Sequence, residues 1–527
     1  MRNPSVMGHS FSNAPDVQIP RSTFDRSHGV KTTFDAGYIV PIFIDEALPG
    51  DTMQVDLRGF ARLATPIYPV MDNMFMETFF FSVPYRQLQD NWKKLCGEQI
   101  DPGDSTDFTV PQVTDINNEA NESLADYFGI PTQVAANLPV NAWAFRAYNK
   151  IWNEWFRDQN LQDSLPVPTN DGPDTIADYT LQKRGKRHDY FTSCLPFLQK
   201  GDAVQLSLGE RAPVLGIGKV NQNWTTGSTV YETGQTAAST YVSSQNINGG
   251  AGDSFWKAEE DPNNAGFPNI HTDLSAATAS TVNELRQAVQ VQKFLERDAR
   301  SGTRYPEILH SHFGVISPDA RQQRSEYLGG GSQIVSIMPV ARTDSQPGVL
   351  GARAETFFKG HGFNKSFTEH CIVLGFVNVR ADLTYQNGLD RMWSRQTKYD
   401  HYWPEFAHLG EQAVLNKEIY VDAAGIGAGT TEDVFGYQEK DADYRYKKSM
   451  ITGKFRSNDA VSLDAWHLSQ EFTSLPVLDD TFITDNPPID RVIAVPSEPH
   501  FIYDSYINYR HTRPMPTYAI PGFIDHF

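Results

Sequence analysis

The alternation of hydrophobic and polar residues predicts that most regular structure in this chain is β-strand. Between Met53 and Leu63 apolar and polar residues alternate, which is the period of a strand with one buried face. The run Asn73–Val83 is mostly apolar and aromatic, which is typical of a strand covered on both faces. The same criteria predict further strands, at Gly37–Ile44, Ala203–Leu208, Pro213–Ile217, Gln333–Pro339, Ala354–Lys359, Cys371–Ala381, Ser449–Phe455 and Glu498–Tyr503. We therefore expect a mainly β fold.

Helical spacing occurs in three places. Tyr85–Gly97 and Asn141–Gln159 have the clearest pattern, and the second carries a stripe of aromatic residues that is more typical of packing than of a cofactor site. A third helix, which is amphipathic, is predicted to end near Ala299, at the start of the stretch Gln292–Gly331. Arginines and acids interleave through this stretch as far as the glycines Gly329–Gly331, where the backbone is free to take positive φ.

Two polar segments lack the apolar material for a core of their own. Residues 1–31 are rich in Pro, Ser and Asn and slightly basic, so we expect an extended N-terminal arm. Asn221–Ser280 holds one base against six acids, and we expect a surface loop between two β elements. Residues 32–527 are then expected to form a single domain with insertions.

Composition narrows the functional classes. The chain has 527 residues and a net charge of −19, from 64 acids and 45 bases. Free proteins that bind nucleic acid are usually basic, so this charge argues against a dedicated nucleic-acid enzyme but leaves room for one basic face. The three cysteines are far apart and odd in number, which argues against a disulfide framework. The sequence has no apolar run long enough to span a bilayer and no apolar region typical of a secretory signal.

One segment carries the chemistry of a single-stranded nucleic-acid contact. Basic residues stand directly before the aromatic pair Tyr190-Phe191, and further arginines lie on the N-terminal arm. A single-stranded nucleic acid is bound by basic side chains that attract its phosphates and by aromatic rings that stack on its bases. The candidate DNA contacts are Lys183, Arg184, Lys186, Arg187, Arg2, Arg21 and Arg26. A solvated or subunit-interface charge run is the alternative.

No catalytic constellation is evident. The sequence lacks a complete phosphate-binding loop, the zinc motif H-E-x-x-H, the nucleophile elbow G-x-S-x-G and paired C-x-x-C motifs. His310 and His312 would share one face of a strand, but no third metal ligand accompanies them, so packing or solvent-facing roles are favoured. We expect no metal, no cofactor and no enzyme activity. An all-β carbohydrate-binding or carbohydrate-active protein stays open as the alternative function, and it would need two converging carboxylates in a cleft.

Five long segments together resemble one family. They are Ser27–Thr52, Phe145–Ser164, Lys186–Gly201, the stretch from Glu296 to Gly331, and Arg513–Phe527. In this order they are similar to the major capsid protein of gokushoviruses, small single-stranded DNA phages of the Microviridae. Asn221–Ser280 shows no such resemblance and falls where that family is variable.

The resemblance implies an eight-stranded antiparallel jelly roll of the viral capsid type with long insertions. It also implies a T=1 icosahedral shell around circular single-stranded DNA, with the insertion 221–280 forming a protrusion at the three-fold axes that contacts the host. The implied partners are other copies of the chain, an internal scaffolding protein, a DNA pilot protein, a small basic DNA-binding protein and a bacterial surface receptor. The implied location is the virion, with assembly in the host cytoplasm.

Self-association suggests further candidate residues, because aromatic and Arg-rich segments commonly anchor interfaces. The expected subunit contacts are Trp152, Trp155, Arg297, Arg300, Arg304, Arg321, Arg324, Arg513, Phe523 and Phe527. The expected host-attachment residues are the aromatics of the insertion, Trp224, Tyr231, Tyr241, Phe255 and Trp256.

Overall fold

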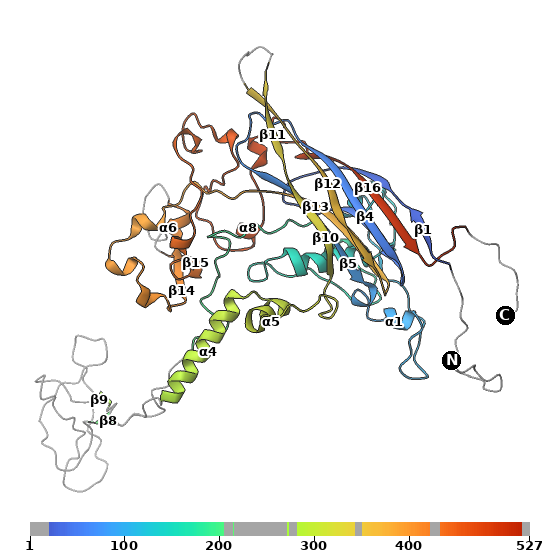
Figure 1. The fold of residues 1–527 in the computed structure, drawn as a ribbon, viewed down its shortest axis with the longest axis horizontal. Helices are drawn as coiled ribbons and strands as arrows, with labels where there is room; N and C mark the ends of the chain where they lie inside the picture. Colours follow the sequence, from blue (N-terminus) through green and yellow to red (C-terminus); the bar gives the residue numbers. More distant parts are fainter. Residues whose placement is uncertain are drawn as a thin grey trace, which may run out of the picture. The chain divides into compact units, whose positions relative to one another are not determined.

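The computed structural model describes residues 20–204, 282–342, 350–421 and 433–518, and the backbone of two short strands, β8 (Val214–Leu215) and β9 (His271–Thr272). The chain divides into two compact units. One comprises Met1–Leu198 and Ser301–Phe527, and the other is Gln199–Arg300. The larger unit is built on antiparallel β-sheets (Figure 1), which confirms the prediction of a mainly β chain. The predicted insertion 221–280 falls within the residue range of the smaller unit. A single domain with insertions over residues 32–527 stays a prediction.

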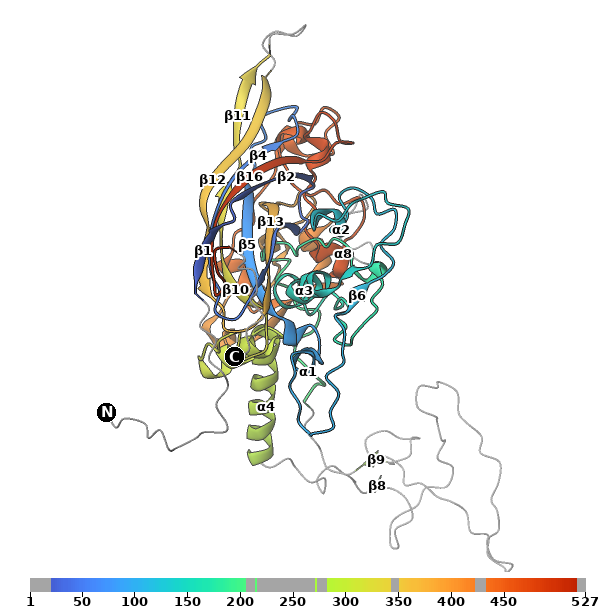
Figure 2. The ribbon, with the colours of Figure 1, turned by 90° about the vertical axis from the view of Figure 1, so that its right-hand side faces the viewer.

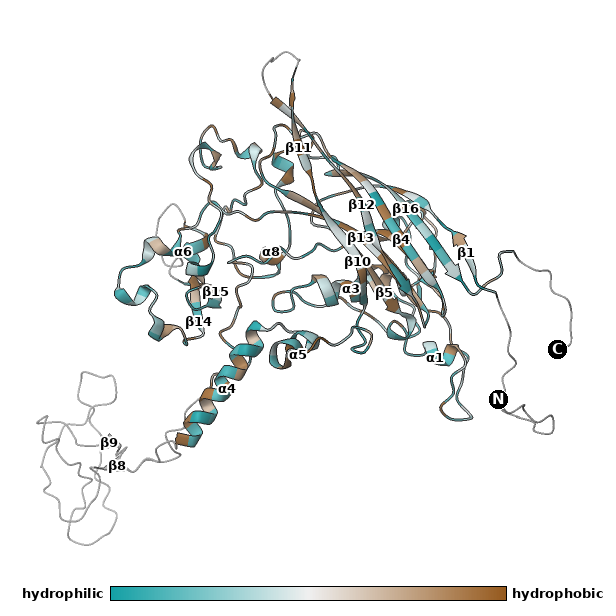
Figure 3. Ribbon diagram, viewed as in Figure 1, coloured by the Kyte–Doolittle hydropathy of each residue, from teal (hydrophilic) through white to brown (hydrophobic). Residues whose placement is uncertain are grey.

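The larger sheet has six strands, all paired antiparallel with their neighbours. In spatial order they are β1 (Ser22–Asp25), β16 (Phe501–Arg513), β4 (Thr52–Leu63), β12 (Leu350–Ser366) and β11 (Ser336–Ala341), and β2 (His28–Phe34) also pairs with β16. Along β4 buried and outward-facing residues alternate as predicted. Figure 3 shows this alternation of hydrophobic and hydrophilic residues along the strands.

The second sheet has four strands and lies between two hydrophobic cores. Its order is β10 (Glu326–Ile334), β5 (Met74–Pro84), β13 (Cys371–Ala381) and β3 (Val40–Ala47). Phe80 of β5 packs into the core shared with the six-stranded sheet, whereas the next residue, Phe81, packs into a core with the helix around Trp143. This double covering explains why β5 is apolar on both faces. The predicted boundaries of β13 are confirmed.

The helices are mostly short and lie in the connections between strands. They are α1 (Trp92–Leu95), α2 (Leu124–Tyr127), α3 (Trp143–Ile151), α5 (Tyr305–Phe313), α6 (Asn416–Ile419), α7 (Ala442–Arg445) and α8 (Asp480–Ile483), with a π-helical turn η2 at Trp152–Phe156. In the smaller unit α4 spans Val282–Arg300, as its amphipathic pattern predicted. In the view of Figure 2, α2, α3 and α8 lie on the side of the four-stranded sheet that faces away from the six-stranded sheet.

Short strands and 3-10 turns complete the connections. The strands are β6 (Gln112–Val113) with β7 (Val140–Asn141), and β14 (Glu411–Leu415) with β15 (Val434–Glu439). The turns are Tyr85–Gln87, Ile176–Asp178, Arg391–Ser394, Lys398–Asp400, Pro404–Phe406, Gly453–Phe455, Asp464–Trp466 and Ile489–Arg491.

Of the expected extended arm, residues 22–25 lie in β1 and residues 28–31 in β2, whose backbone pairs with β16. Two sequence predictions about local structure are wrong. The segment Ser449–Phe455 contains only a 3-10 turn, Gly453–Phe455. His310 and His312 lie on the helix α5 and not on a strand.

The glycine run Gly329–Gly331 does not end the preceding stretch but lies inside β10. Close approach of backbone explains the glycines: a Cβ on Gly330 would lie 2.0 Å from the carbonyl oxygen of Thr78. A Cβ on Gly329 would lie 2.4 Å from the carbonyl oxygen of Gly362 in β12. The run therefore allows the two sheets to meet closely at this end.

Candidate functional site

The predicted DNA-contact segment, Lys183–Arg187, is fixed to the larger unit by backbone pairing. Tyr38, just before β3, forms a β-bridge with Lys183, and Gly185 forms one with Thr484. The backbone amide of Arg184 also donates to the carbonyl of Gly37. The segment therefore lies along the chain that enters β3 and is not a free basic arm.

A buried carboxylate, Glu77 on β5, gathers three arginines around this segment. Arg184 donates to the Glu77 carboxylate, Arg380 lies 2.8 Å from it and Arg187 lies 3.5 Å from it. Burial alone would raise the pKa of Glu77, but the positive charges of the arginines outweigh burial and hold it below its ordinary value. Arg187 also lies 3.4 Å from Asp382. The arginine charges are thus largely balanced within the chain.

The two lysines of the segment also have partners within the chain. Lys186 is buried, donates to the side-chain oxygen of Gln470 over 3.0 Å and lies 4.3 Å from the ring centre of Phe482. Burial lowers the pKa of Lys186 to about 8 and raises that of the neighbouring Asp485 to about 6. Lys183 donates to the side-chain oxygen of Asn486 over 2.6 Å. DNA contact by these four residues stays a prediction, and the contacts described here are structural.

Two of the three arginines predicted on the arm contact side chains of the β-sheets. Arg26 pairs with Asp45, lies 3.0 Å from a ring nitrogen of His511 and stands 5.3 Å from the ring centre of Tyr509. Arg21 donates to the hydroxyl of Thr52 over 3.1 Å. The remaining arm candidate, Arg2, lies outside the described residues.

Arg513, a predicted subunit contact, takes part in a buried cluster at the end of β16. It lies 2.9 Å from the Asp51 carboxylate, which also lies 2.9 Å from His511, and both of these partners are fully buried. Burial lowers the pKa of His511, and the charge of Arg513 lowers it further. The cluster fixes the last strand to the turn before β4.

Two segments predicted separately as subunit contacts contact each other within the chain, and their role between subunits stays a prediction. The indole nitrogen of Trp155 donates to the hydroxyl of Ser325 over 2.9 Å, and Arg324 lies 3.7 Å from the centre of the Trp155 ring. Arg304 donates to the carbonyl of Arg157 over 2.8 Å. The stretch after α4 therefore packs on the turn η2 in the same chain.

The other subunit and host candidates lie in different environments, and some lie outside the described residues. Trp152 is buried and donates to the carbonyl of Lys183 over 2.9 Å, whereas Arg321 is exposed. Arg297 and Arg300 lie on α4 in the smaller unit. The candidates outside the described residues are Phe523, Phe527, Trp224, Tyr231, Tyr241, Phe255 and Trp256.

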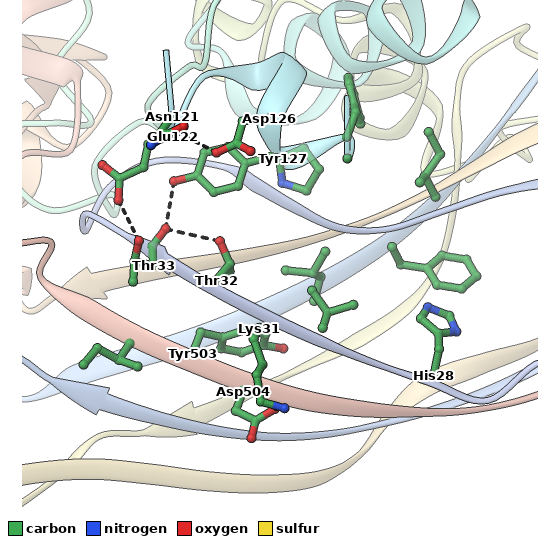
Figure 4. Close-up of a pocket in the computed structure, with 18 of the residues that line it drawn as sticks. His28, Lys31, Thr32, Thr33, Asn121, Glu122, Asp126, Tyr127, Tyr503 and Asp504 are labelled. Carbon is green, nitrogen blue, oxygen red and sulfur yellow. Dashed lines mark hydrogen bonds and ion pairs between the residues drawn. The ribbon is translucent and has the colours of Figure 1, made fainter. Parts of the chain in front are cut away.

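A cavity of about 1190 Å³ lies beside β2, and three carboxylates, Glu122, Asp126 and Asp504, are among the side chains that line it (Figure 4). Glu122 accepts a hydrogen bond from the hydroxyl of Thr33 over 2.7 Å. Asp126 accepts one from the backbone amide of Glu122, and Asp504 lies 3.4 Å from Lys31. These carboxylates serve local contacts, and their geometry gives no support to a glycosidase-type pair.

Among the residues that the structure describes, no group of three His, Cys, Asp or Glu side chains could hold a metal ion. None of the helices in the described ranges is both long and apolar enough to cross a membrane.

Sequence reasoning missed the buried ion pair between Arg146 and Asp174. Arg146 is fully buried on α3, and its guanidinium lies 2.6 Å from the Asp174 carboxylate. A charged residue among the aromatics of the predicted helix Asn141–Gln159 was the available signal, because a buried charge requires a partner.

Comparison with known proteins gives matches along almost the whole chain. A family model described as capsid protein (F protein) matches residues 12–523. A relative named capsid protein VP1 from Bdellovibrio phage phiMH2K is 48% identical over 536 residues, covering 98% of each chain. The protein of the same name from Chlamydia phage 1 is 42% identical over 605 residues, covering 98% of each chain. That from Spiroplasma virus 4 is 35% identical over 544 residues, covering 98% of this chain and 97% of the relative.

Proposed function

This chain belongs to the capsid protein (F protein) family of phages, and we propose that copies of it assemble into a T=1 icosahedral shell around circular single-stranded DNA. The observation that carries the proposal is its likeness, over nearly its full length, to three phage proteins named capsid protein VP1. This likeness favours a structural role in the virion, with assembly in the host cytoplasm, over a carbohydrate-binding protein or an enzyme.

The shell-forming fold that we propose is an eight-stranded antiparallel jelly roll. Strand order supports it: β2-β16-β4-β12 in one sheet and β3-β13-β5-β10 in the other. The strands β1 and β11 extend the first sheet. The connection from β5 to β10 then carries the largest insertion, which includes the smaller unit.

Shell formation is tested by producing the chain together with the phage's internal scaffolding protein. We expect closed particles in velocity sedimentation and in electron micrographs, because modest contacts repeated by symmetry add up over a closed shell. A soluble, folded chain that remains monomeric under these conditions would refute the proposal.

We further propose that the C-terminal tail joins neighbouring copies. Since Arg513 is held by Asp51 within its own chain, the informative truncation removes only residues 519–527, which include Phe523 and Phe527. The truncated chain should fold but assemble poorly. Normal particles would show that the tail is not a contact, and the remaining candidates Arg297, Arg300 and Arg321 would then be tested by substitution with Gln.

The insertion 221–280 is proposed to form the three-fold protrusion and to bind the bacterial surface receptor through its aromatic residues. Exchanging it for the corresponding loop of a relative should change adsorption to host cells while particles still form. If particle formation fails first, the insertion is a structural element.

DNA contact by the basic segment needs a control for its structural role. Substituting Arg184 and Arg187 with Gln should lower the DNA content of particles if they bind phosphate. Glu77→Gln leaves both arginines in place but removes the carboxylate that they surround. If Glu77→Gln lowers DNA content equally, the effect comes from the disturbed cluster. The DNA pilot protein and the small basic DNA-binding protein are proposed partners in packaging.

A further inference from the structure

The outward face of the six-stranded sheet presents large aromatic side chains to solvent. In Figure 2 the helices α2 and α3 lie beyond the other sheet, away from this face. Phe60 is 40% exposed, Phe357 65% and Tyr506 54%. Such a group of exposed rings on one sheet marks an interaction surface.

The three rings are close neighbours in the sheet. Phe60 on β4 and Phe357 on β12 are register partners, and Tyr506 on β16 is the partner of Arg58, two residues from Phe60. Adjacent strands lie about 4.8 Å apart, and alternate residues of one strand lie about 6.8 Å apart. The rings are therefore spaced so that neighbouring bases of one nucleic-acid strand can stack on them.

The charges on this face are mainly basic, although the whole chain carries −19. The outward positions of β4, β12 and β16 hold five basic residues, Arg58, Arg62, Arg353, Lys359 and Arg510, and three acidic ones, Asp56, Glu355 and Asp504. Each of these three acids is already ion-paired, with Arg58, Arg353 and Lys31 respectively.

Two cations of the face are available to a ligand. Within the described ranges, Arg62 and Lys359 have no acidic side chain at ion-pair distance. They differ in this from Arg184 and Lys186, whose charged groups have partners in their own chain.

We infer that this sheet face is a binding platform for single-stranded nucleic acid. Phe60, Phe357 and Tyr506 stack on bases, while Arg62 and Lys359 contact phosphates. The inference rests on the proposed function, since it assigns the six-stranded sheet to the DNA side of the shell. Every base has a ring face, so stacking of this kind binds any sequence, as packaging of a whole genome requires.

The first experiment measures binding of a fluorescent oligothymidine to the purified, unassembled chain. Phe60→Ala, Phe357→Ala and Tyr506→Ala together should weaken binding at least tenfold, because removing one stacked base costs about 1–3 kcal/mol and 1.4 kcal/mol is tenfold. These side chains are exposed, so the melting temperature should change little. Unchanged affinity in a folded triple variant overturns the inference.

Matched controls localise the effect. The variant Trp393→Ala, Tyr399→Ala, Tyr446→Ala removes three exposed rings from the connection between β13 and β16, and it should bind normally. An equal loss of affinity in this control would overturn the assignment to the sheet face.

The charged residues are tested by salt dependence. Arg62→Gln with Lys359→Gln should reduce the slope of log K against log salt by about 1.4, because each phosphate of a single strand that a cation neutralises adds roughly 0.7 to the slope. Lys93→Gln with Lys454→Gln removes the same charge from elsewhere and should leave the slope unchanged. Equal slopes in both double variants would contradict phosphate binding at the sheet.

A last measurement separates this inference from the proposed function. In particles packaged with 5-iodouracil DNA, ultraviolet cross-linking and mass spectrometry should identify peptides from β4, β12 and β16. Particles that form normally but cross-link only elsewhere, for example at 183–187, overturn the inference and leave the proposed function intact. Aromatic triple variants that bind oligothymidine normally but no longer form particles would instead assign the face to contact between copies, which also overturns it.

Discussion

Replacing Asp174 by asparagine tests how the connection after β5 is held on the four-stranded sheet. Arg146 of α3 donates to both Asp174 carboxylate oxygens, over 2.7 and 2.6 Å. It also donates to the carbonyls of Leu88 and Asn170 over 2.8 Å, and Tyr179 donates to the same carboxylate. One buried ion pair therefore joins several separate segments of the connection to α3.

Asparagine keeps the size of the side chain but removes its charge. Arg146 then stays fully buried without a compensating carboxylate, and one of its donors faces the amide NH₂ group. Breaking a buried pair in this way costs about 3–5 kcal/mol, a large part of the roughly 5–15 kcal/mol that stabilises a typical folded protein. We expect Asp174→Asn to lower the free energy of unfolding by this amount.

The assay is urea denaturation of the unassembled chain, followed by tryptophan fluorescence. Glu355→Gln is the matched control, because it neutralises a carboxylate in an exposed pair with Arg353, and such pairs contribute at most about 1 kcal/mol. Adding Arg146→Met to Asp174→Asn should recover part of the loss, since no uncompensated charge remains. A cost for Asp174→Asn no larger than that of the control would refute the reasoning.

Three further predictions concern backbone contact, titration and thiol access. Gly330→Ala should abolish soluble expression or lower stability by roughly 3 kcal/mol or more, since its Cβ would lie 2.0 Å from a backbone oxygen of Thr78, whereas Gly103→Ala, in open space, should be neutral in thermal melts. Burial raises the pKa of Asp485 from 3.8 to about 6, so the folded chain holds a proton more tightly than the unfolded chain. The free energy of unfolding should therefore fall by about 2.4 kcal/mol as pH rises from 4 to 7, and Asp485→Asn should remove most of this fall in urea titrations. Cys96 is exposed and the other two cysteines are buried, so a thiol reagent should modify one cysteine rapidly in the native chain.

A specific experimental result would contradict each of these three predictions. Wild-type expression and melting of Gly330→Ala would contradict the close approach of β10 to β5. An unchanged pH dependence in Asp485→Asn would place the titrating group elsewhere. Rapid reaction of all three thiols would show that the two buried cysteines are accessible in solution.

The sequence predicted those strands whose buried faces produce a regular pattern of apolar residues. β4 and β13 were predicted to within one residue because hydrophobic packing on one or both faces dictates their residue types. β1 and β2 were missed because they are held by backbone pairing with β16 and bury few apolar side chains. The glycine run was not predicted to lie in a strand. Glycine is required there because the backbones of β5 and β12 approach β10 closely.

The candidate contacts were harder to predict than the strands. Sequence shows where charges are but not which charges meet in space. The arginines around Lys183–Arg187 resembled a phosphate site, yet their partner Glu77 lies on β5, about a hundred residues earlier. The group of exposed rings on the sheet face was not predicted, because each ring is a single residue between buried neighbours in its own strand. Only the register of β4, β12 and β16 brings the rings together.

The position of β16 in the six-stranded sheet also determines when that sheet can form. β16 is the last strand that the structure describes, yet it pairs with β1, β2 and β4 near the beginning of the chain. Its His511 meets Asp51 across 460 residues of sequence. During synthesis, β4 must wait with one edge unpaired until the ribosome releases the final strand, and such long-range pairing is slow. A chain that ends before β16 thus lacks the finished sheet, so only copies that include β16 can enter assembly.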